Sequence, residues 1–282
     1  MMTLALRGIN KLGNALTHRQ RRFILDRLGV AAFLTNLPSE AFDEVLLPNG
    51  IMLSINPLLH SNLSKNGRLD YEDDVAHVIE RCLEPGDVFF DVGANVGVFA
   101  FLAATVVGEE GAVFAFEPES NNVLCFQRSL ERAPVRNVEL RDCALGGEDG
   151  TMVFDRRGGA FSGRLVDGDD EVGSGGTRSI QVRSIDSLLA GGMRPPKLIK
   201  IDVEGGEGLV LEGARQTLSK YRPAVLCEMH PDNPDGVSRA FAELADAGYI
   251  GRSIERSTRQ ADEIISGPRA TDSTYHVLAL PN

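Results

Sequence analysis

DVFFDVGANVGVFA, residues 87–100, is the stretch of sequence that decides the fold. Its first half, 87–93, is an apolar run of the length typical of a buried strand, and 96–107 is an apolar stretch of helical length. The turn between them contains Gly93 and Gly97, which allow the backbone to approach a ligand because glycine has no Cβ. A strand, a glycine turn and a helix in this order predict the first β–α unit of a Rossmann-like α/β sheet, where a cofactor usually binds.

The same alternation continues after this unit. Further apolar runs predict strands at 112–117, 138–145, 197–203 and 223–229, and a last one in the tail at 273–281. Helical stretches separate them, at 119–132, 207–221 and 236–247. Strands that alternate with helices indicate an α/β fold with a mostly parallel sheet and helices on both of its faces.

The N-terminal part of the chain, residues 1–80, has a different character. Pro48-Asn49-Gly50 lies between two β-like runs and predicts a hairpin, and 71–83 predicts a helix. Residues 1–34 are basic, with apolar residues at roughly helical spacing. We interpret them as an amphipathic helix packed on the domain, with weak contact to an anionic membrane surface as the alternative. We therefore expect a helical and hairpin extension over 1–80 and the cofactor-binding domain over 81–282.

Charge and composition narrow the compartment and the class of partner. The net charge is −11 and the isoelectric point is near 5.0, so the overall field repels nucleic acid. No apolar run reaches the length of a membrane span, and the 4 cysteines show neither CxxC nor Cys/His zinc spacing. We therefore expect a cytoplasmic protein without a nucleic-acid partner, and the oligomeric state stays open.

An acidic residue precedes the glycine turn. The sequence D-V-G-A-N-V-G, from Asp91 to Gly97, lacks the middle glycine of the dinucleotide-binding pattern G-x-G-x-x-G. A carboxylate repels a pyrophosphate group but suits an ammonium or sulfonium group. The candidates for binding a cationic cofactor are therefore Asp91, Gly93, Ala94, Asn95 and Gly97, and an NAD-linked oxidoreductase on the same fold is the alternative.

Two further acids lie near the ends of the next strands. Glu117 ends the second predicted strand, about where ribose hydroxyls bind in these folds. Asp142 lies on the third strand beside Cys143 and Ala144, where a carboxylate could accept a hydrogen bond from an adenine amino group while small neighbours pack the ring. Each acid alone could be a solvated strand end. Three acids at successive strands after a glycine turn favour a nucleoside-containing cofactor.

The fourth and fifth predicted strands also end in polar side chains, at the edge that faces the cofactor in such sheets. Asp202 and Glu204 end the fourth strand, and Glu228 and His230 end the fifth. Each is a candidate for the base that removes a proton from an acceptor hydroxyl, and His230 has the most suitable ordinary pKa. Two alternatives stay open: the carboxylates hold Mg²⁺, or Asp202 only caps the turn at Gly205-Gly206 and His230 is an ordinary exposed histidine.

The interval 146–180 interrupts the alternation, because it is rich in Gly, Asp and Arg and shows no apolar periodicity. A loop of this length is either functional or flexible. We expect it to cover the carboxyl edge of the sheet and to shape an acceptor pocket through Phe161 and Arg164. A flexible surface loop is the alternative.

Several segments together resemble the FkbM family of S-adenosylmethionine-dependent methyltransferases. They are DVGANVGVFA, FEPESNNVLCF, CALGGEDGTMVF, VRSIDSLL, LIKIDVEGGEGLVLEGA and the closing HVLA. The resemblance covers roughly residues 87–230, and VRSIDSLL followed by IKIDVEGGE is its most specific part. It implies the class I methyltransferase fold with a seven-stranded sheet. Ser120 stands where the family often has proline.

The resemblance also implies roles for individual residues. The turn from Asp91 to Gly97 matches the methionine end of the cofactor, Glu117 the ribose acid, Asn122 the asparagine of the next helix, and Asp142 and Ala144 the adenine neighbourhood. Asp202 and Glu204 match the segment beside the transferred methyl group. The implied activity is O-methylation of a hydroxyl on a sugar, polyketide or related small molecule. A non-catalytic cofactor-binding protein is the remaining alternative.

Overall fold

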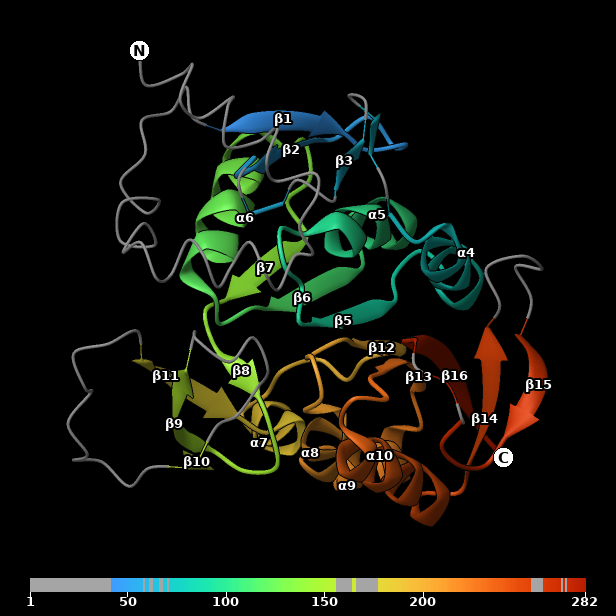
Figure 1. Ribbon diagram of the computed structural model, residues 1–282. Coiled ribbons are helices and arrows are strands. Elements are labelled where there is room, and N and C mark those ends of the chain that lie inside the picture. Colours follow the sequence, from blue (N-terminus) through green and yellow to red (C-terminus); the bar gives the residue numbers. More distant parts are fainter. Residues whose placement is uncertain are drawn as a thin grey trace.

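The computed structural model (Figure 1) describes residues 42–57, 59, 60, 63–65, 68, 69, 71–155, 164, 165, 177–254, 261–269, 271 and 273–282. The amphipathic helix expected within 1–34 and the expected pocket residue Phe161 lie outside the described residues. Within the described part of the chain, no helix is both long and apolar enough to cross a bilayer.

An eight-stranded sheet runs through the middle of the molecule. Its strands, in spatial order, are β15 (Ala261–Ile265), β14 (Tyr249–Ile254), β16 (Tyr275–Pro281), β13 (Ala224–Met229), β12 (Leu198–Ile201), β5 (Val88–Val92), β6 (Ala112–Phe116) and β7 (Val138–Arg141). The strands from β13 to β7 are parallel to one another, and β16, β14 and β15 add to β13 by antiparallel pairing. The expected α/β class with a mostly parallel sheet is thus confirmed.

The expected count of seven strands is wrong by one, because β15 extends the sheet beyond β14. Neither β14 nor β15 was predicted from the sequence. Ile264 on β15 is 60% exposed, so this edge strand is held by its pairing with β14 and not by an apolar run of its own.

Two expected elements are also divided. The strand at 138–145 ends with β7, and Ala144–Leu145 (β8) joins another sheet.

The helix expected at 207–221 is two helices, α8 (Glu207–Glu212) and α9 (Arg215–Tyr221). Gly213 separates them, and a Cβ at this position would lie 2.0 Å from the carbonyl oxygen of Gly146. The close backbone approach breaks the helix, although the apolar pattern continues through it.

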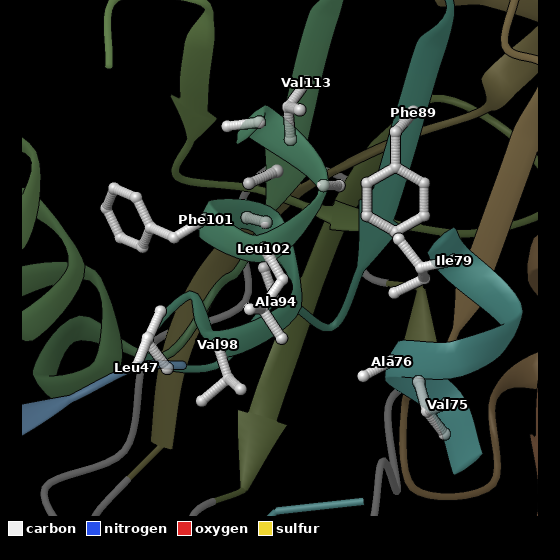
Figure 2. Packing of buried hydrophobic residues seen from close by; sticks show 14 of the residues in the cluster. Leu47, Val75, Ala76, Ile79, Phe89, Ala94, Val98, Phe101, Leu102 and Val113 are labelled. Atoms are coloured by element: carbon white, nitrogen blue, oxygen red, sulfur yellow. The ribbon is translucent and has the colours of Figure 1, made fainter. Parts of the chain in front are cut away.

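Helices cover both faces of the sheet (Figure 1). One face carries α4 (Asp73–Cys82), α5 (Val98–Val107) and α6 (Ser120–Arg132), and the other carries α7 (Ile185–Ala190), α8, α9 and α10 (Pro234–Asp246). Side chains of β5 alternate between the two cores, as the two-residue period of a strand requires: Phe89 packs on the α4–α5 side and Phe90 on the α8–α10 side. In Figure 2 the Phe89 ring lies against Ile79 of α4.

The hairpin predicted at Pro48-Asn49-Gly50 is confirmed, with β1 (Asp43–Leu46) antiparallel to β2 (Met52–Ile55). Its Leu47 and Ile51 are buried in the same core as Phe101 of α5. A short pair, β3 (Ser64–Lys65) and β4 (Arg68–Leu69), follows, and the helix expected at 71–83 is α4. The division of the chain near residue 80 stays a prediction.

Part of the interval 146–180 forms strands that the sequence did not predict. A second sheet has the order β10 (Arg164–Leu165), β9 (Gly150–Asp155), β11 (Thr177–Arg183) and β8. These strands are antiparallel except for β8 with β11. The proposed contact of Phe161 and Arg164 with an acceptor stays a prediction, since nothing is described of either side chain.

Candidate functional site

The sheet brings the predicted polar residues into one row at its carboxyl edge. The register pairs Val92 with Phe116 and Ile201, and Ile201 with Cys227. The next residue along each chain therefore lies in the following row, which consists of Gly93, Glu117, Asp202 and Glu228. By strand alternation this row points to the same face as Phe89, Leu198 and Leu226, the face covered by α4 and α5.

The glycine turn is pressed against the end of β12. Gly93 has a φ of +77°, and a Cβ there would lie 1.8 Å from the carbonyl oxygen of Asp202. Its N–H donates to the carbonyl of Phe116 over 3.0 Å. Gly97 and Asn95 are also left-handed, with φ of 96° and 52°. The turn thus needs glycine at 93 for two reasons, and it couples the expected cofactor loop directly to Asp202.

Asp91 is fully buried behind this turn, with 0% of its surface exposed. Lys200 Nζ lies 3.6 Å from its Oδ1, yet neither carboxylate oxygen accepts a hydrogen bond. Burial raises the pKa of Asp91. A buried carboxylate with unused acceptor capacity fits a ligand that brings donors or positive charge, as the amino end of S-adenosylmethionine does.

Glu117 is 5% exposed, and both of its oxygens accept backbone hydrogen bonds. Oε2 accepts from the N–H of Asn95 over 2.8 Å, and Oε1 from the N–H of Glu119 over 2.7 Å. Burial raises its pKa to about 7, although these bonds favour the charged form. The Asn122 side chain adds a third hydrogen bond, and the two oxygens keep further acceptor capacity for ribose hydroxyls.

Of the remaining predicted cofactor residues, Asn122 contacts Glu117 through a side-chain hydrogen bond. Asn122 Oδ1 lies 2.9 Å from Nε2 of His60, whose Nδ1 accepts from the N–H of Asn56, so Nε2 carries the ring proton and donates to Asn122. Asp142 is exposed and Cys143 half-buried. Ala144 packs with Met152, Ile180 and Val182 in the core of the second sheet. The sequence did not predict that the N-terminal segment, through His60, would contact the candidate cofactor residue Asn122.

Lys200 is a buried cation between two of the predicted acids. Its Nζ lies 3.2 Å from Asp202 Oδ2 and 5.2 Å from the centre of the Phe99 ring. Burial alone would raise the pKa of Asp202, but Lys200, the hydrogen bond from Glu228 and the charge of His230 together outweigh it and lower this pKa to about 2. The turn that Asp202 was alternatively expected to cap is capped by Glu207, which accepts from the N–H of Gly205 over 2.8 Å. Asp202 is therefore an ionised carboxylate at the cofactor edge.

His230 is buried at 6% exposure, so the expectation of an ordinary exposed histidine is wrong. Its Nδ1 lies 2.9 Å from Glu207 Oε1, and its Nε2 lies 3.5 Å from Glu228 and 3.6 Å from Glu204. Burial opposes the charged ring, but the carboxylates around it raise the pKa of His230 to about 9. At neutral pH the ring is thus protonated, which suits a hydrogen-bond donor better than a base.

Glu228 lies between Asp202 and His230. Burial and the negative charge of Asp202 raise its pKa to about 8. A base is most effective when its pKa is near the working pH, so Glu228 is better matched to proton removal than Asp202 or His230. The sequence brought Glu228 forward as one of four candidates and could not rank it, because the ranking depends on neighbours from other strands.

A second histidine site was missed. His276 of β16 is opposite Glu228 in the sheet register, and its Nε2 lies 3.5 Å from Glu72 Oε2 while its Nδ1 lies 3.7 Å from Asp74 Oδ2. These acids begin α4, and they outweigh burial in raising the pKa of His276 to about 10. No local motif marks this contact, because it joins the start of α4 to the last strand.

Among the described residues, two sets have ligand atoms within 4.8 Å of one another, close enough to hold a metal ion: Glu72, Glu228 and His276, and Asp202, Glu228 and His230. The charges of Lys200 and of the two histidines already compensate these carboxylates. The described carboxylates at this edge outnumber these three cations, so the surroundings stay acidic and favour cationic ligands of any kind.

Comparison with known proteins identifies relatives. The family model described as the methyltransferase FkbM domain matches residues 91–250. The hexuronic acid methyltransferase AglP of Haloferax volcanii is 30% identical over 203 residues, which cover 71% of this chain and 78% of that protein. A family of methyltransferases is thus matched over the whole edge from Asp91 to His230.

Solved structures are more distant. The FkbM methyltransferase of Methylobacillus flagellatus is 18% identical with a TM-score of 0.42, over 68% of this chain and 43% of that one. An S-adenosylmethionine-dependent O-methyltransferase of Thermotoga maritima is 13% identical with a TM-score of 0.45, over 85% of this chain and 77% of that one. The chain spans less than half the length of the first of these structures.

Proposed function

This chain belongs to the FkbM family of methyltransferases, and from that premise we propose that it transfers the methyl group of S-adenosylmethionine to a hydroxyl oxygen of a sugar-like acceptor. The observation that carries the proposal is the row of Gly93, Glu117, Asp202 and Glu228 at one edge of the sheet. The family assignment removes the NAD-linked oxidoreductase from consideration, in agreement with the absent middle glycine of the turn.

In this proposal the cofactor lies across the row. Glu117 accepts from the ribose hydroxyls, and the turn from Gly93 to Gly97 follows the methionine portion. The unused oxygens of Asp91 and the ionised Asp202 favour the positively charged amino and sulfonium groups. Asn122, Asp142, Cys143 and Ala144 remain proposed neighbours of the ribose and the adenine.

S-adenosylmethionine supplies the activated methyl group, and the residues of this chain position the acceptor and take its proton. The acceptor oxygen forms the new bond to the methyl carbon while the carbon–sulfur bond breaks and sulfur keeps the electron pair. The hydroxyl proton passes to Glu228, of which about a tenth is ionised at pH 7. Asp202 orients the reactants. The protonated ring of His230, whose Nε2 lies 3.5 Å from Glu228 and 3.6 Å from Glu204, donates hydrogen bonds at the same edge.

The nature of the acceptor is supported by the hexuronic acid methyltransferase to which the chain is similar. A hexuronic acid offers two kinds of oxygen: hydroxyls, which need a base, and a carboxylate, which does not. We favour a hydroxyl because a carboxyl group of suitable pKa lies at the edge.

The test is methyl transfer from S-adenosylmethionine with a labelled methyl group to sugars from cell extract, followed by mild alkali. A methyl ether keeps its label in alkali, whereas a methyl ester releases it as methanol. Alkali-stable label on a sugar is expected. Volatile label would redirect the proposal to the carboxylate, and the absence of any transfer, with S-adenosylhomocysteine bound, would favour the non-catalytic alternative.

Three further features belong to the same proposal. The net charge of −11 supports a small acceptor instead of nucleic acid. The 4 cysteines, all free, support a cytoplasmic place of action. We propose that Mg²⁺ is not required, since Lys200 already compensates Asp202. The division into an extension over 1–80 and a methyltransferase domain over 81–282 is also proposed, with His60 linking the extension to Asn122.

A further inference from the structure

A cavity of about 420 Å³ opens beside the site, between the loop that follows β13 and the loop that precedes β16. The described residues that line it include Pro231, Pro234, Pro268, Arg269, Thr271 and Tyr275. None of them belongs to the row of acids. The volume lies within the range of small-molecule sites, which is roughly 300–1,000 Å³.

The chain ties this cavity closely to the reacting edge. Pro231 directly follows His230, and Tyr275 directly precedes His276. Tyr275 is also paired with Met229 in the sheet register, so both walls of the cavity continue strands that end at Glu228 and the two histidines. The cavity therefore opens at the carboxyl end of β13, where α10 adds Val237 to its lining, and its Pro231 is joined to His230, whose Nε2 lies 3.5 Å from Glu228 of the row.

The lining combines apolar faces with one charged group. Three proline rings and the Tyr275 ring offer apolar surfaces of the kind that pack on the C–H faces of a sugar. Arg269 is the only charged residue among the described ones in the lining, and its guanidinium lies 5.9 Å from the centre of the Tyr275 ring. The Tyr275 hydroxyl accepts from the N–H of Arg269 over 3.1 Å, which attaches the loop to β16.

The position of this arginine is informative because the surroundings are acidic. The reacting edge carries Glu72, Asp202, Glu204 and Glu228, and the whole chain has a net charge of −11. An anionic acceptor approaches such an edge only if a cation compensates its charge locally. A guanidinium does so with two parallel hydrogen bonds to a carboxylate, a geometry that also orients the bound molecule.

We propose that this cavity is the acceptor subsite and that it takes a sugar carrying a carboxylate, which Arg269 binds while the ring packs against Tyr275 and the prolines. The inference rests on the proposed function, because it assigns the acceptor of the same reaction. Arg269 lies outside every segment that the sequence singled out, Tyr275 belongs to the predicted strand at 273–281 but had no site role there, and the family match ends at residue 250.

The experiment measures sugar binding to the full chain saturated with S-adenosylhomocysteine, by saturation-transfer NMR titration. The probes are D-glucuronate and D-glucose, which share a ring and differ in the carboxylate. Glucuronate is expected to bind at least about tenfold more tightly, the scale of one charge-assisted bidentate contact. Arg269→Gln removes this preference, and Arg269→Lys keeps part of it because it retains the charge without the fork.

Arg239→Gln is the matched control, since it removes an exposed arginine of α10 that lies near Glu212 and not in the cavity. It should leave both sugar affinities unchanged, and no variant should alter the affinity for S-adenosylhomocysteine. Equal binding of the two sugars to the native protein, or a preference that survives Arg269→Gln, overturns the subsite alone. Failure of the native protein to bind S-adenosylhomocysteine overturns the proposed function, and the acceptor assignment with it.

Discussion

The pKa of Glu117 leads to a prediction in which cofactor affinity and stability change in opposite directions with pH. Burial raises this pKa to about 7, while ribose hydroxyls donate best to the ionised carboxylate. The ionised fraction of a group with this pKa is roughly 0.1 at pH 6 and roughly 0.9 at pH 8. The affinity for S-adenosylhomocysteine is therefore expected to rise by close to tenfold between pH 6 and pH 8.

The ligand-free protein should show the reverse trend. An acid whose pKa is higher in the folded state is costly to ionise there, so its contribution to stability is intact below the ordinary pKa of 4.5 and is lost as the pH rises through about 7. The loss is at most about 3.5 kcal/mol for the shift from 4.5 to about 7, at about 1.4 kcal/mol per pKa unit. The melting temperature without ligand should therefore fall over this range while binding improves.

Calorimetric titration with S-adenosylhomocysteine from pH 6 to pH 8, together with thermal melts, measures both trends. Glu117→Gln should weaken binding and abolish most of its pH dependence. Glu139→Gln is the control, because Glu139 is an exposed carboxylate of β7 that pairs with Arg141 and should leave the pH profile unchanged. A flat affinity profile in the native protein, or the same slope in Glu117→Gln, would refute the assignment of Glu117 to the ribose.

Three other predictions concern the turn and the reacting edge. Gly93→Ala should lower the free energy of unfolding by more than about 3 kcal/mol or prevent folding, since its Cβ would lie 1.8 Å from a backbone oxygen. The control Gly50→Ala, at a φ of +84° but with no atom within 4 Å of its Cβ, should lower it by only about 1 kcal/mol. Equal urea midpoints for the two variants would contradict this reasoning. Asp202→Asn should reduce turnover by roughly a hundredfold and also lower the melting temperature, because it removes a charge partner of the buried Lys200, whereas near-normal turnover would remove Asp202 from the reacting centre. Treatment with a chelator should leave turnover unchanged, and a loss that Mg²⁺ restores would instead assign one of the two carboxylate–histidine sets to a metal ion.

Local sequence was sufficient for the fold class and for most of the polar residues of the candidate site. A strand buried on both faces is a continuous apolar run, so β5, β6, β12 and β13 could be predicted within a residue or two of their ends. The side chains that follow such strands must meet at the carboxyl edge, and this rule located Glu117, Asp202, Glu228 and His230. The glycine turn was equally visible, because its backbone conformation demands glycine at the position itself.

What the sequence could not supply depends on contacts between distant segments. Edge strand β15 exists because β14 offers it a partner, and Gly213 divides a helix because Gly146 approaches it from another loop. His276 meets Glu72 because β16 inserts between β13 and β14.

The same holds for the chemistry of the edge. By residue type alone, His230 had the most suitable ordinary pKa for a base, and nothing in the sequence distinguished the acids Asp202, Glu204 and Glu228 from one another as bases. Glu207 and Glu228 keep His230 protonated, Lys200 keeps Asp202 ionised, and Asp202 in turn keeps the proton on Glu228 near neutral pH. A pKa is set by burial and by charges a few ångströms away, so the sequence determines which ionisable groups reach the edge, and the tertiary structure decides which of them carry a proton.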